Sequence, residues 1–326
     1  MSKSDVLHNI ILEVYFRIAV VYRTYFFFIN MRGFLTILFL FKLISATPTP
    51  IVLWHGMGDT CCLSVSLGSF KRFLERSIPG VYVLSLRIGN NAIEDFENGY
   101  FLSPNTQVEY VCETLALDPK LKDGFNAIGF SQGGQFLRGV VQRCGHRLPP
   151  IKNLISMGGQ HQGVYGLPHC GALKSKTCDN IRKLLNYAAY YKFVQDKLVQ
   201  ATYWHDPLEE DVYKQKSEFL ADINNERAIN QTYVDNLYKL NKLVLVLFTN
   251  DTIVQPKETE WFGFYKPGQA VELLTLQQSD IYLQDRLGLK KMDETSKLAF
   301  LRSEGDHLHF DGDWFIANIM KPYLLD

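Results

Sequence analysis

The chain has 326 residues, of which 47% are hydrophobic and 13% aromatic, and its 34 basic residues balance 34 acidic ones. A chain of this length and composition can bury a large core, and α/β folds commonly reach this size as one domain with an insertion. Because the net charge is zero and no run of lysine and arginine occurs, the sequence argues against a nucleic-acid-binding protein, which needs a clustered basic surface.

The N-terminal segment has the parts of a secretory signal. Arg32 supplies a positive charge, residues 34–44 are apolar except for one lysine, and Ser45 and Ala46 form a small-residue cleavage site. We expect residues 1–46 to be an N-terminal extension and signal peptide that is removed. A retained membrane anchor is the alternative.

Six cysteines follow the expected cleavage site, and an even number in a secreted chain favours disulfides. The spacing of the cysteines favours two disulfides between residues that are close in sequence, Cys112 with Cys144 and Cys170 with Cys178. The adjacent Cys61 and Cys62 remain, and neighbouring Cα atoms lie only about 3.8 Å apart, below the usual range for a disulfide. The residues alone therefore leave the third bridge open. No CxxC pair occurs, so we expect no zinc site.

Two glycosylation sequons agree with a secreted protein. They are Asn230-Gln231-Thr232 and Asn250-Asp251-Thr252. We therefore predict N-linked glycans at Asn230 and Asn250.

Short apolar runs alternate with segments of helical length along most of the chain. Apolar residues at consecutive positions are typical of strands covered on both faces, so the alternation predicts a mostly parallel central sheet with helices on both faces. The predicted helices include 66–80, 106–121 with Asn105 or Thr106 as the cap, and 132–144. The predicted strands are 51–54, 81–86, 125–130, 151–157, 242–248 and 297–301.

This alternation breaks between residues 158 and 241. The stretch has no strong strand run, but 180–204 and 210–226 have helical patterns. We expect a mainly helical subdomain at about 158–241, inserted into a domain that covers 47–326.

Ser131 lies between two glycines in Gly129-Phe130-Ser131-Gln132-Gly133, after a predicted strand and before a predicted helix. This is the context that the G-x-S-x-G nucleophile elbow requires, since glycines relieve crowding around a strained serine. The alternative is an ordinary tight turn between a strand and a helix.

A nucleophilic serine needs a base, and the base needs an orienting acid. On this type of sheet the chain order is serine, acid, histidine, with the last two in loops after late strands. Asp251 follows the predicted strand 242–248, and His307 follows 297–301. We predict Ser131, Asp251 and His307 as a catalytic triad.

Several residues compete for these roles. His309 lies two positions from His307, and an H-x-H metal site would need a third ligand that the sequence does not supply, so we predict no metal. Asp306 is interpreted as a turn residue. Three more aspartates compete with Asp251 but follow no comparable strand: Asp280, Asp285 and Asp293.

The oxyanion hole needs two backbone N–H groups. One is expected from Gln132 and the other from Met57, in the His55-Gly56-Met57-Gly58 segment after the first strand. The alternative is a glycine turn that only closes this strand. His55 is interpreted as a structural hydrogen-bonding residue.

Seven strings of the chain are long and specific: WHGMGD (54–59), GFSQGGQFLRG (129–139), MGGQHQGVYGLP (157–168), LVQATYWHDP (198–207), EWFGFY (260–265), QDRLGLKKMD (284–293) and EGDHL (304–308). Together they resemble the lysosomal palmitoyl-protein thioesterases, and the resemblance covers about residues 48 to 326. The resemblance implies an α/β-hydrolase fold, the triad Ser131, Asp251 and His307, and oxyanion donors at Met57 and Gln132. It also implies three disulfides, Cys61–Cys62, Cys112–Cys144 and Cys170–Cys178.

The resemblance further implies a serine hydrolase that cleaves the thioester between palmitate and cysteine in S-acylated proteins or peptides, with palmitoyl-CoA as another substrate. It implies an acyl groove formed with the inserted segment, no cofactor, no nucleic-acid partner and no membrane span in the mature protein. Delivery to the lysosome is expected, with secretion as the other destination. The alternatives are an acyl-CoA thioesterase or lipase on the same scaffold, and a catalytically silent lipid-binding module.

Overall fold

A computed structural model describes residues 47–166 and 186–325. The expected signal segment 1–46 and the pair Cys170 and Cys178 lie outside the described residues. Pro48–Asp326 forms one compact unit. In the described ranges, no helix has both the length and the apolar character needed to cross a membrane.

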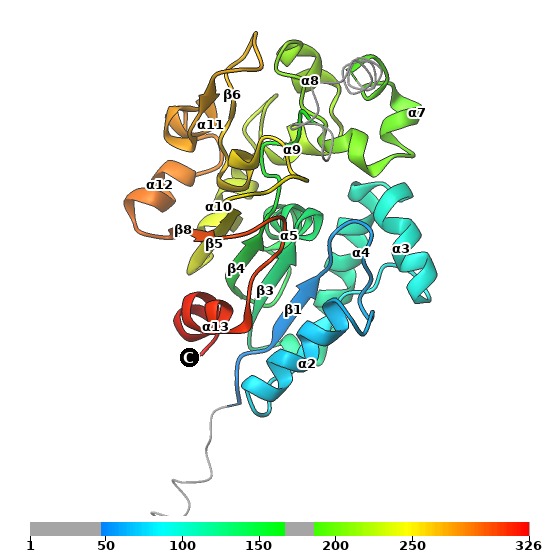
Figure 1. Cartoon of the computed structure of the whole chain (residues 1–326), viewed down its shortest axis with the longest axis vertical. Coiled ribbons are helices and arrows are strands. Elements are labelled where there is room, and N and C mark those ends of the chain that lie inside the picture. Colours follow the sequence, from blue (N-terminus) through cyan, green and yellow to red (C-terminus); the bar gives the residue numbers. More distant parts are fainter. Residues whose placement is uncertain (1–46, 167–185, 326) are drawn as a thin grey trace, which may run out of the picture. The chain divides into compact units, whose positions relative to one another are not determined.

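The central sheet has six strands in the order β2-β1-β3-β4-β5-β8, and every neighbouring pair is parallel (Figure 1). All six predicted strands occur, so the prediction of a parallel α/β sheet is confirmed. β2 is shorter than predicted, and β8 ends two residues later. The strands are β1 (Ile51–Trp54), β2 (Val83–Ser85), β3 (Phe125–Phe130), β4 (Ile151–Met157), β5 (Lys242–Phe248) and β8 (Leu298–Ser303).

Helices cover both faces of this sheet, because successive side chains of a strand point to opposite sides. In β1, Ile51 and Leu53 join one buried cluster, whereas Val52 and Trp54 join the other. The first cluster includes residues of α2 (Leu67–Ser77), α13 (Gly312–Phe315) and the π-helix η5 (Ile316–Leu324). The second includes residues of α4 (Pro104–Leu117), α5 (Gln132–Cys144) and α10 (Gln231–Tyr238).

Two details of the helix predictions are corrected. α4 begins at Pro104 with Ser103 as the cap, not at Asn105 or Thr106, because proline is favoured at the first position of a helix. A helix that the sequence analysis missed, α3 (Ala92–Phe101), follows Asn91. The Asn91 side chain accepts hydrogen bonds from two backbone N–H groups of the first turn, so an asparagine followed three residues later by glutamate was the available signal.

The segment 158–241 is more broken than its helical pattern predicts. The run 210–226 divides because the Ser217 hydroxyl donates to the carbonyl of Thr202, 3.0 Å away, and the backbone leaves the helix there. The described part contains α7 (Lys192–Gln195), η2 (Val199–Tyr203), α8 (Glu210–Lys216), α9 (Leu220–Ile223) and α10.

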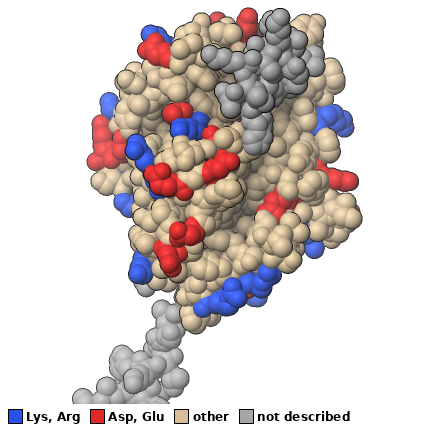
Figure 2. All heavy atoms as spheres, viewed as in Figure 1, with Lys and Arg blue, Asp and Glu red and all other residues tan. Residues whose placement is uncertain are grey.

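The remaining elements are short. They are η1 (Pro119–Leu121), η3 (Lys257–Trp261), β6 (Phe264–Tyr265), β7 (Leu273–Leu274), η4 (Leu276–Gln278), α11 (Asp280–Leu283) and α12 (Leu289–Glu294). On the face that Figure 2 shows, acidic and basic groups are interspersed with wide uncharged areas, in keeping with the balanced composition.

Candidate active site

Ser131 lies on a sharp turn between β3 and α5. Its φ is 51°, in the left-handed region that non-glycine residues rarely adopt. A Cβ on Gly129 would lie 2.4 Å from the carbonyl oxygen of Gly133, and one on Gly133 would lie 2.4 Å from that of Trp54. Both glycines are therefore required for the close approach of strand and helix, as expected for a nucleophile elbow.

His307 and Asp251 meet across the ends of β8 and β5. His307 Nδ1 is hydrogen-bonded to Asp251 Oδ2. The other oxygen of Asp251 accepts from the N–H groups of Ile253, at 2.7 Å, and Val254, at 2.8 Å. Burial raises the pKa of Asp251, but the hydrogen bond from His307 and the other donors outweigh it, so the net pKa is lowered and the carboxylate is ionised.

His307 also lines the cavity that contains Ser131. The contacts of the described residues include no hydrogen bond between the Ser131 hydroxyl and His307. Catalytic hydrogen bonds often shorten only when substrate is bound. Because Nδ1 is engaged by Asp251, Nε2 is the nitrogen left to act on the serine.

The rival residues occupy other positions. His309 is exposed, and its backbone N–H donates to the carbonyl of Asp306. The Asp306 carboxylate accepts hydrogen bonds from the N–H groups of Thr252, at 2.9 Å, and His307, at 2.8 Å. It therefore connects the loop after β5, which contains Asp251, to the loop after β8, which contains His307. Asp285 accepts from the N–H of Lys290, far from the serine in sequence and outside both cavities at Ser131.

Glu260 lies behind Asp251 and was not singled out from the sequence. Its side chain is completely buried; Oε2 accepts from the N–H of Phe248 at 2.8 Å, while Oε1 has no donor among the described residues. Burial and the neighbouring Asp251 raise the pKa of Glu260 well above its ordinary value. A protonated Oε1 that donates to Asp251 satisfies both buried carboxyl groups.

These three side chains could also be considered as metal ligands. One atom from each of Asp251, Glu260 and His307 lies within 4.8 Å of the others. The His307 Nδ1 atom is already hydrogen-bonded to Asp251, and the raised pKa of Glu260 disfavours the ionised carboxylate that a cation needs, so this cluster fits a hydrogen-bonded chain behind His307 better than a cation site.

The two predicted oxyanion donors flank Ser131. Gln132 is the first residue of α5, so its N–H has no partner inside the helix. Its side chain is held by the carbonyl of Gly99, at 3.0 Å, and the hydroxyl of Tyr203, at 3.1 Å. Met57 lies in the loop after β1, and its N–H donates to no described residue. Both residues line the cavity at Ser131.

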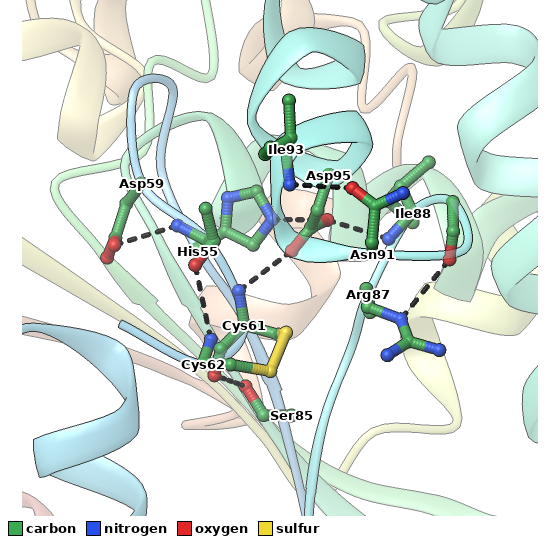
Figure 3. The surroundings of a disulfide bond; sticks show 12 residues. His55, Asp59, Cys61, Cys62, Ser85, Arg87, Ile88, Asn91, Ile93 and Asp95 are labelled. Carbon is green, nitrogen blue, oxygen red and sulfur yellow. Dashed lines mark hydrogen bonds and ion pairs between the residues drawn. A yellow bond between two sulfur atoms is a disulfide. The ribbon is translucent and has the colours of Figure 1, made fainter. Parts of the chain in front are cut away.

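The loop that carries Met57 is anchored by the buried Asp95 of α3 (Figure 3). Asp95 accepts from His55 Nε2 at 3.0 Å, from the N–H of Cys61 at 2.8 Å and from the N–H of Ile88 at 2.7 Å. Burial lowers the pKa of His55, but the hydrogen bond and charge of Asp95 outweigh it, and the net pKa is raised. His55 is therefore a structural residue of this loop.

Two disulfides are present in the described residues. Cys112–Cys144 joins α4 to α5, with a Cα–Cα distance of 6.0 Å. Cys61–Cys62 closes a bridge between adjacent residues, with a Cα–Cα distance of 3.7 Å, in the loop anchored by Asp95 (Figure 3). The geometric argument against the adjacent bridge is therefore overturned by the structure. Asn230 and Asn250 of the two sequons are both exposed.

Two cavities meet at Ser131, and both also contain Met57 and Ile253. The first, of about 300 Å³, is lined largely by described residues of the segment 158–241 and has mainly apolar walls, which include Leu198 and Trp204. The second, of about 370 Å³, is lined by residues of α2 and of the loop after β8.

Comparison with known proteins places the chain in a family. The family model for palmitoyl protein thioesterases matches residues 50–307. Palmitoyl-protein thioesterase 1 of Caenorhabditis elegans is 49% identical over 276 residues, which cover 85% of this chain and 92% of the relative. Palmitoyl-protein thioesterase 3 of Dictyostelium discoideum is 40% identical, over 86% and 91% of the two chains. Lysosomal thioesterase PPT2 of Bos taurus is 29% identical, over 74% and 75%. The six-stranded parallel sheet with a serine elbow after β3 has the arrangement expected of an α/β-hydrolase fold, and these matches show that the chain belongs to the palmitoyl protein thioesterase family.

Proposed function

We propose that this protein hydrolyses the thioester between a long-chain fatty acid, palmitate above all, and cysteine in S-acylated proteins or peptides. The observation that carries the proposal is the position of Ser131 on a strained elbow at the junction of two cavities, beside the hydrogen-bonded pair His307 and Asp251. The family membership supports the thioester as the bond that is cleaved.

The proposed reaction has two steps. Ser131 Oγ attacks the thioester carbonyl carbon while its proton passes to His307 Nε2, and the N–H groups of Met57 and Gln132 stabilise the oxyanion. The C–S bond then breaks, the proton passes from His307 to the sulfur, and the thiol leaves. In the second step, water attacks the acyl-serine while His307 takes its proton. The bond between Ser131 Oγ and the acyl carbon then breaks, His307 gives the proton to Oγ, and the fatty acid leaves. Asp251 holds the imidazole in the required tautomer throughout.

The first cavity is the proposed acyl groove. Much of its wall belongs to the segment 158–241, which supports the prediction that this insertion contributes to substrate binding. Because each buried methylene contributes about 0.8 kcal/mol, a long chain can supply most of the binding energy. The proposed substrates therefore include palmitoyl-CoA as well as many S-palmitoylated proteins. The Ile253 and Val254 side chains complete the wall from the loop after β5.

The proposed site of action is the lysosome, reached through the secretory pathway. Relatives in the comparison bear the name lysosomal thioesterase, and disulfides agree with an oxidising route. The expected signal at 1–46 and the glycans at Asn230 and Asn250 belong to the same proposal.

The test compares hydrolysis of an S-palmitoyl-cysteine peptide by the wild type and by Ser131→Ala, His307→Ala and His309→Ala. We expect each of the first two variants to lose at least about a thousandfold in kcat, as removal of triad members does in serine hydrolases. His309→Ala, the matched control, should retain activity because its ring is exposed. Loss of activity in His309→Ala alone would assign the base to that residue instead.

Parallel assays with palmitoyl-CoA and with an oxygen ester separate the enzyme classes on this scaffold. Faster cleavage of the peptide thioester than of the oxygen ester supports the proposal. Preference for the ester would identify a lipase. Binding of palmitate without turnover, and without labelling of Ser131 by a fluorophosphonate, would identify a silent lipid-binding module.

A further inference from the structure

The second cavity at Ser131 has no role in fatty-acid binding as described above. The two cavities share Met57, Ser131 and Ile253, so a substrate whose carbonyl lies at Ser131 can extend into both. A thioester has two substituents on its carbonyl carbon, the acyl chain and the sulfur with its peptide. The cavities therefore correspond in number to the two arms of the substrate.

The position of His307 decides which arm enters which cavity. A general acid must lie within hydrogen-bond reach of the atom that it protonates, and here that atom is the departing sulfur. His307 lines the second cavity but is not among the described residues that line the first. The sulfur and its peptide therefore belong on the side of the second cavity.

The walls of the second cavity are apolar and aromatic. Phe70, from α2, and Phe130, from the end of β3, have ring centroids 5.1 Å apart in an edge-to-face arrangement. The ring centroid of Phe310, in the loop after β8, lies 6.1 Å from that of Phe70 and 6.5 Å from that of Phe130. Three rings from three elements thus form one wall around a volume of about 370 Å³, which is enough for a large side chain.

Backbone strain accompanies this wall. Leu308, next to the catalytic histidine, has a φ of 59° and lines the same cavity. Left-handed conformations of leucine are unfavourable and, when retained, cluster at functional sites.

The only acidic side chain among the described lining residues of this cavity is Asp59, whose carboxylate accepts from the N–H of Thr60, at 2.7 Å, and from the hydroxyl of Ser66. A negative charge in the substrate is disfavoured there, whereas an uncharged ring or aliphatic side chain fits.

Resting on the proposed function, we propose that the second cavity is a leaving-group subsite that binds a large apolar or aromatic side chain next to the acylated cysteine. The enzyme would then select its substrates by both groups attached to the thioester carbonyl carbon. The first cavity would determine the preferred acyl length, and the second cavity would determine the preferred residue beside the cysteine.

The experiment uses S-palmitoyl peptides that differ only in the residue beside the cysteine, in one series before it and in another after it. This residue is Phe, Leu, Gly, Asp or Lys. For the wild type, kcat/KM should be at least about tenfold higher with Phe than with Gly in one of the series, because burial of a large apolar side chain is worth at least one tenfold step. Asp should give the lowest value.

Phe310→Ala should reduce the Phe-to-Gly ratio to less than about threefold without changing the preference for acyl length. Because Phe310 also packs against other rings, Phe70→Leu provides a second, milder variant, and thermal unfolding checks that both variants fold. Leu198→Ala, in the wall of the first cavity, is the matched control. It should weaken the preference for long acyl chains and leave the Phe-to-Gly ratio intact.

Three results would overturn the subsite. They are equal wild-type rates in both series, a shift of acyl-length preference in Phe310→Ala, and a preference for a basic neighbour that Asp59→Asn abolishes. The palmitoyl thioester of a small thiol without a peptide separates this failure from failure of the proposed function. If that compound is hydrolysed while the peptides show no preference, only the subsite is wrong; if it is not hydrolysed, the proposed function fails.

Discussion

At the scale of single residues, the site depends on groups that are held in unfavourable states. Ser131 has a positive φ, and the buried Glu260, whose pKa is raised well above its ordinary value by burial and by the neighbouring carboxylate, lies beside Asp251, whose pKa is lowered. Each state costs free energy and persists only because the surrounding contacts determine it. Substitutions that respect these contacts should therefore behave very differently from substitutions that remove them.

Glu260 offers such a matched pair. Glu260→Gln keeps a donor toward Asp251 and an acceptor for the N–H of Phe248, so kcat should stay within about threefold of wild type. Glu260→Ala removes both and should lower kcat by about tenfold or more, since a lost hydrogen bond to a charged group costs about 1.5–3 kcal/mol. Steady-state kinetics of the two variants are the measurement. Equal losses would show that Asp251 needs no donor behind it.

The elbow glycines give a second prediction. Gly133→Ala would place a methyl group 2.4 Å from the carbonyl oxygen of Trp54, which is rigid backbone, so the variant should lose folded, active protein. Gly99→Ala is the control, because a Cβ there meets nothing within 4 Å and the residue lies inside α3. We expect Gly99→Ala to raise the free energy of unfolding by about 0.5–1 kcal/mol. Expression and thermal unfolding of both variants test this contrast.

At the scale of elements, the buried Arg138 of α5 joins this helix to described residues of the segment 158–241. Arg138 is completely buried, and its guanidinium donates to the carbonyl of Ile223 at 3.0 Å, to Asn224 Oδ1 at 2.8 Å and to the carbonyl of His161 at 3.2 Å. Burial lowers the pKa of Arg138 to about 9, which still leaves it protonated at neutral pH. Its hydrogen bonds thus go to backbone and amide dipoles, and the charge of Glu226 further favours the cation.

Arg138→Leu should lower the free energy of unfolding by at least about 3 kcal/mol, because several buried acceptors lose their donors at once. Arg143→Leu is the control on the same helix. Arg143 pairs with Asp222 at 2.6 Å, but both side chains are partly exposed, and such a pair contributes only about 1 kcal/mol or less. Urea denaturation of the two variants measures the difference. Similar losses would mean that Arg138 does not hold the insertion in place.

At the scale of the whole molecule, stability should depend on pH through Glu226, which is remote in sequence from the triad. Glu226 lines a pocket together with His205, Glu210 and Lys214. Burial raises its pKa from 4.5 to about 7, while His205, Lys214 and Arg286 lower it and Glu210 raises it further. Because the folded state prefers the protonated acid, the protein loses stability as pH rises from the unfolded pKa toward 7.

Glu226→Gln mimics the protonated acid and removes this loss. Near pH 4.5 we expect the variant and the wild type to have the same free energy of unfolding. At pH 7.5 the value for the variant should be higher by about 1–3 kcal/mol, a range that is reduced because the carboxyl group is partly exposed. Thermal unfolding at several pH values is the measurement. The exposed Glu97, changed in Glu97→Gln, is the control and should show no such pH-dependent gain. A gain at pH 4.5 as large as at pH 7.5 would contradict the assignment.

The sequence by itself determined the sheet and the candidate triad, because both depend on local patterns in a known order. Consecutive apolar residues predicted all six strands, and the positions of Asp251 and His307 after two of them followed from the chain order. Tertiary structure decided what depends on contacts between distant segments. It distinguished His307 from His309 by the hydrogen bond to Asp251, divided the helical pattern at 210–226, and placed Glu260 and Asp95 behind the site. A buried carboxyl group takes its proton and its partner from its surroundings, and no local pattern encodes them.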